Sequence, residues 1–478
     1  MNDQLINPYV FIRKVKPECN ERYPWSDIGD SRLFAHCYKG IVRYVPERKC
    51  WYIYHDGIWQ EDLGGLRVMA LCKEFACSLK RYSKTIKPED TQKYYSEYCK
   101  KWQRRSGRET ILKDAYDICP TSINDFDTDL HTLNCRNGTL HLDTMTFTEH
   151  RPEDMLTKMC PVDYDPNAKC ERFERFIDEI MSGDMEKARF LQKALGYALS
   201  GMTHHECMFV LWGESTRNGK STLAETVRKV LGTYACSAKA ETLGLNNYAN
   251  GQSHSEDVAR LVGMRFVNIP EPDKGLVFNG GLVKSLTGNN TVNARRLYEN
   301  SFDYTPRFKL YLDCNHLPLV NDMTLFDSRR LVIIPFNRHF GPEEQDRGLK
   351  SFFAQPENQA GILNWLIDGY RLLAEEGLDP PASVLAAMGV YEEDNDMMSL
   401  FVKEHLVAHP AAEVRTSDVY KRYRSWCEEN CIVPESARMF NAGLRRIGTI
   451  ARKRPKAGGG MTTMLLSYQL LPIEPHEE

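Results

Sequence analysis

The sequence lacks the features that mark membrane-spanning and secreted chains. Its 478 residues contain no run of about 18 consecutive apolar residues, which argues against a transmembrane helix. The first twenty residues, MNDQLINPYVFIRKVKPECN, contain no continuous apolar segment, so we expect neither a signal peptide nor membrane association. The formal net charge is only −3, and this sum excludes neither acidic partners nor nucleic acid, because local patches of charge decide binding.

The 15 cysteines include no CxxC pair, and their tightest spacings are Cys72/Cys77 and Cys427/Cys431. A zinc ribbon needs such pairs, and a disulfide scaffold needs an oxidising compartment. We therefore predict reduced thiols. The chain length predicts roughly three domains.

What the sequence does contain is a glycine-rich segment, FVLWGESTRNGKSTLAETV, at residues 209–227. The apolar run at 207–212 predicts a buried parallel strand, and Leu223, Val227 and Leu231 share one face of a predicted helix. A strand, a loop and a helix in this order form a phosphate-binding loop, because backbone N–H groups and the helix N-terminus attract anions.

The loop is one residue longer than the usual pattern, since five residues separate Gly213 from Gly219. We place the extra residue within 214–218, where it leaves the Gly-Lys-Ser triplet undisturbed relative to the helix. The predicted nucleotide contacts are Gly213, Asn218, Gly219, Lys220, Ser221 and Thr222. The alternative is a helix N-cap at Ser221 with a solvated Lys220.

Two further predicted strands end in polar residues. The strand at 265–269 runs into Glu271 and Asp273, and the strand at 308–313 runs into Asn315. Carboxylates can hold Mg²⁺ and orient water, and a neutral amide can hold the attacking water or a γ-phosphate. Which carboxylate activates the water stays open.

Two arginines, Arg329 and Arg330, precede the predicted buried strand in DSRRLVIIPF. An arginine that reaches the γ-phosphate of a neighbouring subunit stabilises transition-state charge, as an arginine finger does. The alternative is a pair of surface ion pairs. The spacing does not distinguish which of the two would be the finger.

The order of these motifs resembles superfamily 3 DNA helicases, and in particular the phage, plasmid and poxvirus-type primase–helicase group. The segment VKSLTGNNTVNARR is similar to the group's Leu-Thr-Gly-Gly-Asp…Ala-Arg stretch, and NIPEPDKG and NHLP are similar to its acidic and sensor motifs. Phosphate loops of this group often read GxxxRNGKST, which accounts for the extra residue. Upstream, WYIYHDGIWQED and FLQKALGYALSG are similar to the group's helical collar.

The resemblance implies an α/β fold with an AAA+ type ATPase core, in which helices flank a parallel sheet. An N-terminal, mainly α collar domain and a C-terminal winged-helix domain would flank this core. ATP would bind between the subunits of a hexameric ring around single-stranded DNA. The implied catalytic residues are Glu271, Asp273, Asn315, Arg329 and Arg330, and the implied Mg²⁺ ligands are Ser221, Glu271 and Asp273.

The resemblance also implies a DNA-contacting pore segment at residues 284–296. Its implied DNA contacts are Lys284, Asn289, Asn290, Arg295 and Arg296, with Asn289, Asn290 and Thr291 near the tip of a hairpin. Asn289 and Asn290 stand where the group has Gly-Asp, so this chain departs from the group's pattern there.

The expected domains follow from these motifs. They are an N-terminal segment (1–44), a helical collar for oligomerisation (45–200), the ATPase core (201–345), a helical lid and linker (346–395) and a winged-helix-like DNA-binding domain (396–478). The 44 residues before the expected collar leave no room for a polymerising primase domain, so we expect no primer synthesis by this chain.

Basic residues gather in two segments outside the core. Lys101, Arg104, Arg105 and Arg108 fall on one face of a predicted helix, which either is solvated or contacts phosphate or another subunit. Residues 415–456 hold eleven Lys/Arg against four Asp/Glu, and two helices followed by strands around a basic loop predict a winged helix. Its predicted DNA contacts are Arg438, Arg445, Lys453 and Arg454. The alternative is a small basic cap that serves oligomerisation.

Together these features predict an ATP-dependent, ring-forming DNA helicase for replication of a phage, plasmid or integrated element, in the cytoplasm of a bacterial host cell. The alternative is an origin-binding initiator that uses ATP as an assembly switch without processive unwinding. The expected cofactors are ATP and Mg²⁺. The expected partners are single-stranded and forked DNA, further copies of the chain in a hexamer, and a separate primase or polymerase.

Overall fold

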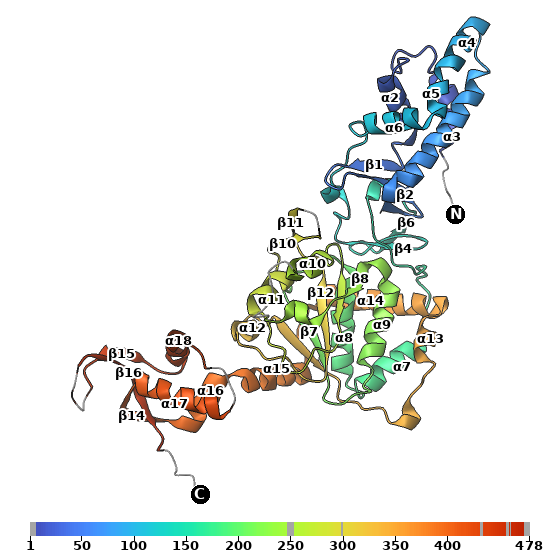
Figure 1. Ribbon diagram of the computed structural model, residues 1–478. Helices are drawn as coiled ribbons and strands as arrows, with labels where there is room; N and C mark the ends of the chain where they lie inside the picture. Colours follow the sequence, from blue (N-terminus) through green and yellow to red (C-terminus); the bar gives the residue numbers. More distant parts are fainter. Residues whose placement is uncertain are drawn as a thin grey trace.

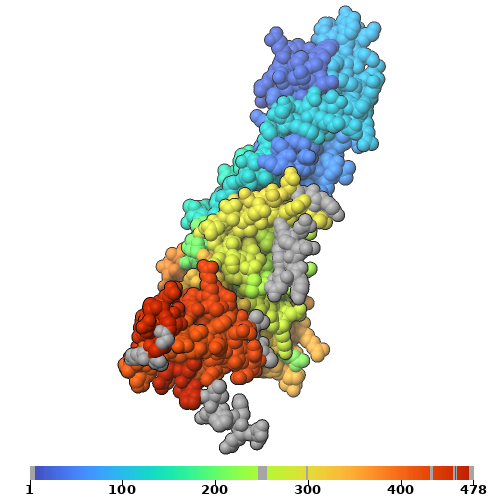
Figure 2. Space-filling view, turned by 60° about the vertical axis from the view of Figure 1, so that its left-hand side comes forward, coloured from blue at the N-terminus to red at the C-terminus, as the bar shows by residue number. Residues whose placement is uncertain are grey.

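The structure is a computed structural model of the chain, and it describes residues 6–245, 253–297, 300–430, 434–455, 458 and 460–472. The chain forms three lobes in an extended molecule (Figure 1): an N-terminal lobe (residues 6–126), a central core (residues 127–395) and a C-terminal lobe (residues 396–472). Each lobe has a hydrophobic cluster of its own. In Figure 2 the C-terminal lobe lies beside the end of the core that is remote from the N-terminal lobe.

The N-terminal lobe combines helices with a small sheet. Its helices are α1 (Pro8–Val15), α2 (Asp27–Tyr38), α3 (Leu66–Ser83), α4 (Glu89–Tyr98), α5 (Lys100–Gln103) and α6 (Arg105–Asp114), and its antiparallel strands are β1 (Val42–Val45), β2 (Cys50–His55) and β3 (Ile58–Glu61). Phe34, Phe75 and Trp102 are fully buried between the helices. Asp56 and Gly57 form the two-residue turn between β2 and β3, both with positive φ, which is the backbone conformation a tight hairpin needs.

A second antiparallel sheet lies at the top of the core in Figure 1. Its strands are β4 (Thr132–Cys135), β5 (Gly138–His141) and β6 (Thr146–Thr148). The part of the chain that we predicted to be mainly helical therefore also contains two three-stranded sheets.

The predicted basic helical stripe in the N-terminal lobe is wrong. Arg104 has extended backbone (ψ 143°), so α5 ends before it and α6 begins after it. Lys101 pairs with Asp30 at 2.6 Å, and the guanidinium of Arg108 donates to the carbonyl oxygen of Trp102 at 2.9 Å. Lys101 and Arg108 are therefore bound to other residues of the same lobe.

The core is built on a five-stranded parallel sheet. Its strands are β7 (Met208–Trp212), β8 (Ala235–Ser237), β9 (Phe266–Ile269), β12 (Lys309–Cys314) and β13 (Leu331–Pro335), in the order β13-β7-β12-β9-β8. All four neighbouring pairs are parallel. The first strand of this sheet, β7, thus lies between its last two, β12 and β13. Ligands of open parallel sheets bind at the carboxyl ends of strands where the strand order reverses in this way.

Helices cover both faces of this sheet, as the sequence predicted. Phe209 and Leu211 face a cluster with α7 (Glu171–Ile180), α8 (Met185–Gly196), α9 (Lys220–Leu231), α13 (Leu349–Phe353) and α14 (Pro356–Glu376). Met208 and Val210 face the opposite cluster, with α10 (Ser253–Ala259), α11 (Gly280–Thr287), α12 (Thr324–Asp327) and α15 (Ala382–Asn395). Because both faces are buried, the strands read as continuous apolar runs. A hairpin of β10 (Val292–Arg295) and β11 (Ser301–Tyr304) projects from the end of the core nearer the N-terminal lobe (Figure 1).

The C-terminal lobe has the winged-helix fold expected from the sequence. Its elements, in order, are α16 (Met397–His405), β14 (Leu406–Arg415), α17 (Thr416–Glu429), α18 (Ala437–Ile447), β15 (Ile450–Lys453) and β16 (Thr462–Leu470). The antiparallel sheet has the order β14-β16-β15. Phe401, Trp426 and Phe440 form its small core.

Every cysteine within the described ranges carries a free thiol. Among the helices of those ranges, none combines the length and apolarity that crossing a membrane requires.

Candidate functional site

The predicted phosphate loop joins β7 to α9, in the predicted order of strand, loop and helix. Gly219 immediately precedes α9 with a φ of 87°, and a Cβ there would lie 2.4 Å from Ile180 Cγ2. Glycine is therefore required both by the backbone conformation and by the close approach of α7. The longer loop is closed by Asn218, whose side-chain amide donates to the Ser215 carbonyl oxygen at 2.6 Å. Ser221 and Thr222 occupy the first turn of the twelve-residue helix α9, whose free N–H groups attract anions.

Lys220 lies at the centre of the carboxyl edge of the sheet and is 4% exposed. Its Nζ atom donates to Asn315 Oδ1 at 2.8 Å and to the Gly213 carbonyl oxygen at 3.3 Å. Burial lowers the pKa of this ammonium, and the nearby carboxyl groups of Glu271 and Asp313 oppose the shift only in part. Because both of its hydrogen-bond acceptors are neutral oxygens, an anionic phosphate at this edge would stabilise the charged form further.

The loops after β9 and β12 meet beside Lys220. The backbone N–H of Asn315 donates to Glu271 Oε1 at 2.7 Å, which ties the acidic loop to the end of β12. The structure therefore brings together Lys220, Asn315 and Glu271. Asp273 lies two residues further along the same loop and is exposed, and among the described residues no side-chain contact joins it to these three.

One buried carboxylate at this edge was not among the predicted site residues. Asp313 is 7% exposed, and its Oδ2 atom accepts a hydrogen bond from Asn268 Nδ2 at 3.1 Å. Its Oδ1 atom is buried and has no hydrogen-bond partner among the described residues. Burial raises the pKa of this carboxyl to about 7. A carboxylate within the last residues of the buried strand sequence KLYLDC was the signal that could have identified it.

The two arginines lie at the opposite, amino edge of the sheet. Both precede β13, whose five residues pair in register with β7, so roughly 15 Å of strand separates them from the carboxyl edge. Arg329 is exposed and adopts a left-handed backbone (φ 51°). Arg330 is only 15% exposed at its side chain and pairs with Glu206 at 2.7 Å. Their environments therefore differ although they are neighbours in sequence.

The predicted position of the pore hairpin is wrong by several residues. Arg295 pairs with Ser301 as the last pair of the β10–β11 ladder, so the tip lies beyond Arg295. Asn289, Asn290 and Thr291 lie before β10, at the root. The reason is the alternation in VNAR, where Val292 and Ala294 are buried and the intervening side chains are exposed, as in a strand.

The side chains predicted to contact DNA in this segment have different surroundings. Asn289 Oδ1 accepts a hydrogen bond from Thr203 Oγ1 at 2.5 Å, and Lys284 in α11 pairs with Asp322 at 2.6 Å. Both are engaged within the core. Arg295 is exposed at the end of β10, and the guanidinium of Arg296 lies over the Phe302 ring at 5.5 Å. These two arginines are the predicted contacts that lie nearest the tip.

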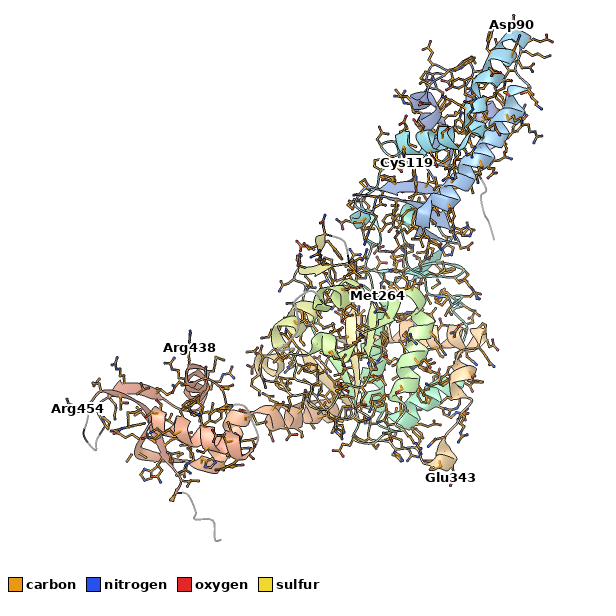
Figure 3. All side chains as sticks on the ribbon, in the orientation of Figure 1. Asp90, Cys119, Met264, Glu343, Arg438 and Arg454 are labelled. Atoms are coloured by element: carbon orange, nitrogen blue, oxygen red, sulfur yellow. The ribbon has the colours of Figure 1, made fainter. Side chains whose placement is uncertain are left out.

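The predicted contacts of the winged helix also separate into two groups. Arg438 and Arg445 are exposed on α18, and Arg454 is exposed just after β15. Figure 3 shows Arg438 projecting from α18 and Arg454 at the far end of the lobe. Lys453 points the other way and pairs with Glu413 of β14 at 2.5 Å, because successive side chains of a strand alternate. The same alternation places the exposed Arg452, which we had not singled out, on the side of Arg454.

Two family models match the chain. The model described as D5 N terminal like matches residues 31–182, and the model described as Poxvirus D5 protein-like matches residues 393–464. The chain is also similar to the apo structure of the NrS-1 C-terminal region, with 10% identity, a TM-score of 0.47, and coverage of 91% of this chain and 97% of that one.

Two viral proteins, each named "Putative helicase", are 26% identical to the chain. The protein of Acanthamoeba polyphaga mimivirus aligns over 67% of this chain and 35% of its own length, and that of Frog virus 3 (isolate Goorha) over 53% and 28%. The chain thus spans about a third of the length of these relatives. A phage or plasmid origin, and with it a bacterial host, stays a prediction. The matches to D5 models in both terminal regions and the helicase-named relatives support a place for the chain in the D5-type primase–helicase group of superfamily 3.

Proposed function

We propose that this chain is the motor of an ATP-dependent DNA helicase for replication, and that it works as a ring of subunits, most simply a hexamer. One observation carries the proposal. Lys220, Asn315 and Glu271 converge at one edge of the sheet, while an exposed arginine, Arg329, stands at the opposite edge. Such a subunit has half of a hydrolytic site on each of two surfaces, and only a neighbour in a head-to-tail ring completes it.

The carboxyl edge fits a magnesium-bound triphosphate. The N-terminus of α9 and the Lys220 ammonium would hold the phosphates, and the Ser221 hydroxyl with Glu271 and Asp273 would hold the metal. Bound Mg²⁺ would neutralise charge on the phosphate oxygens. The unpartnered Oδ1 of Asp313 supports this fit, because a buried carboxylate oxygen needs a donor or a cation. Asn315 would orient the attacking water, and Glu271 would accept its proton.

We assign the trans finger to Arg329. Its exposed side chain is placed to reach a neighbouring subunit, whereas Arg330 is held by contacts inside its own subunit. A guanidinium that approaches the γ-phosphate from outside offsets the negative charge of the transition state.

DNA would be gripped at two places. The hairpin tip with Arg295 and Arg296 would follow single-stranded DNA in the ring, and the exposed arginines of α18 and the wing would bind the phosphates of the duplex at a fork. A separate primase or polymerase remains a proposed partner.

Mixed rings test the proposal most sharply. Lys220→Ala and Arg329→Ala proteins should each lose ATP hydrolysis alone, because one lacks the site and the other lacks the finger. In a one-to-one mixture, about a quarter of the interfaces would join an intact site to an intact finger, so roughly a quarter of the wild-type rate should return. An inactive mixture of properly assembled rings would contradict the shared site.

Strand displacement on a forked DNA then separates a motor from an initiator that uses ATP only as an assembly switch. A motor displaces the strand in proportion to the ATP it hydrolyses. A switch would bind and hydrolyse ATP without displacing the strand, and that result would favour the initiator.

A further inference from the structure

Arg330 joins three segments of the core at the amino edge of the sheet. Its Nη2 atom donates to Glu206 Oε2 at 2.7 Å, just before β7, and its Nη1 atom donates to Thr287 Oγ1 at 2.9 Å. Nη1 also lies 3.3 Å from the Lys284 carbonyl oxygen, in the last turn of α11. The side chain therefore caps the C-terminal end of α11 while it is paired to the entrance of β7.

The end of α11 is also the root of the hairpin. Gly288 follows Thr287 directly, and a Cβ at Gly288 would lie 3.5 Å from Arg330 Nη1. The next residue, Asn289, is bonded to Thr203, which like Glu206 belongs to the segment that leads into β7. Both bonds at the root of the hairpin therefore attach it to the entrance of the strand that carries the phosphate loop.

The backbone of Arg330 is fixed on one side to α12 and on the other to the sheet. Its N–H donates to the Leu325 carbonyl oxygen at 2.9 Å, and its carbonyl oxygen accepts from the Met208 N–H at 2.8 Å. Arg329, one residue earlier, is exposed with a left-handed backbone. A displacement of Arg329 would therefore act directly on Arg330, whose backbone is held by Leu325 and Met208 and whose side chain caps α11.

We infer that Arg330 is the positioning residue that transmits the contact between Arg329 and the neighbouring subunit's nucleotide to the β10–β11 hairpin. The inference rests on the proposed function, because it takes Arg329 as the finger. The planar guanidinium suits this role, since its fixed fork of donors can hold a carboxylate and a helix end at once, whereas an ammonium group would hold them as a point charge. Movement of the finger then shifts the end of α11, and with it the hairpin on the DNA.

Thr287→Val tests the link without altering either arginine. Valine has nearly the shape of threonine but cannot accept from Arg330, and Thr287→Ser restores the hydroxyl. Ser285→Ala is the matched control, because the Ser285 hydroxyl donates to the Gly281 carbonyl oxygen in the same helix, whereas the guanidinium of Arg330 bonds to Glu206, Lys284 and Thr287. We expect Thr287→Val to keep ring assembly and ATP hydrolysis within about twofold of wild type, while base pairs displaced per ATP fall about fivefold or more. Thr287→Ser and Ser285→Ala should behave as wild type.

Hydrogen exchange of residues 288–297 provides a second readout that does not depend on unwinding. In wild type, a non-hydrolysable ATP analogue should change the exchange of this segment, and the change should be absent in Thr287→Val. Unchanged displacement per ATP together with an unchanged exchange response would overturn the inference, as would a parallel loss of hydrolysis and displacement. If Thr287→Val does not assemble, Glu206→Gln weakens the other end of the link and takes its place. If wild type itself displaces no strand, the proposed function fails, and the exchange response still decides whether the link exists.

Discussion

Asp313 offers the most quantitative check on the geometry of the nucleotide edge. Its carboxyl group is 7% exposed, has one hydrogen bond from Asn268, and carries one oxygen without a partner among the described residues. Replacing it by asparagine keeps the size of the side chain and removes the ionisable group. The two proteins should then differ in how their stability depends on pH.

The magnitude follows from the raised pKa. Burial raises the pKa of Asp313 to about 7 from an ordinary value of 3.8, a difference of about 3 units. A carboxyl whose folded-state pKa is raised contributes its full stability below the unfolded value, and this contribution is lost as the pH rises through the folded value. Each unit in this window corresponds to about 1.4 kcal/mol, so wild type should lose about 3 kcal/mol relative to Asp313→Asn between pH 4.5 and 7.5.

The assay is thermal unfolding of both proteins without nucleotide and in the presence of EDTA. The histidines and other carboxylates titrate alike in both chains, so they cancel in the difference. For a core of about 270 residues, the advantage of Asp313→Asn in melting temperature should grow by roughly 5 °C across this pH range and then level off above pH 7.5. A difference that stays constant with pH would refute the burial of an ionisable Asp313 and, with it, the described packing of β9 against β12.

Three further outcomes follow from the same structure. Asn315→Ala should slow ATP hydrolysis about 100-fold, measured by phosphate release, and should change the affinity for a fluorescent nucleotide much less. The reason is that the amide acts on the attacking water more than on bound ATP. An equal loss of hydrolysis and of binding would contradict the role of Asn315 as sensor. Gly219→Ala should destabilise the core by about 2 kcal/mol or more, measured as a lower melting temperature. The added methyl group would clash with Ile180, and alanine would also have to adopt a left-handed φ. An unchanged melting temperature would show that the loop is misplaced. Arg454→Ala should reduce by about one unit the slope of the logarithm of the duplex-binding constant against the logarithm of salt concentration. Lys453→Ala should alter this slope much less, because its ammonium already pairs with Glu413 within the lobe. Equal effects would mean that the two side chains share one surface.

The sequence predicted the features that depend on short stretches of chain. The phosphate loop was recognisable because strand, glycine, lysine and helix follow one another within about twenty residues, and each step has a local physical reason. The helices and wing of the C-terminal lobe were recognisable for the same reason. The turn Asp56-Gly57 carried an equally local hairpin signal, and reading it would have revealed the sheet in the N-terminal lobe.

What the sequence could not predict depends on contacts between distant segments. The difference between Arg329 and Arg330 arises because Glu206, more than 120 residues away, captures only one of them. The hairpin was misplaced because β10 has four residues, too few for its alternation to stand out against the resemblance that put the tip at Asn289. Lys453 was assigned to DNA because its ion-pair partner, Glu413, lies on another strand and is distant in sequence.

The geometry of a parallel sheet explains why two adjacent arginines can serve two surfaces. The predicted phosphate-binding residues follow strands and lie at the carboxyl edge, so a residue that precedes a strand is remote from the proposed site of its own chain. Such a residue can contact only the neighbouring subunit or the segments that enter the sheet beside it. Arg329 is exposed and would be available to the first of these, whereas Arg330 is bound to the second. Because the two residues adjoin at the start of β13, a contact of Arg329 with a neighbour's nucleotide in the proposed ring would also act on Arg330 and on the attachment of the hairpin.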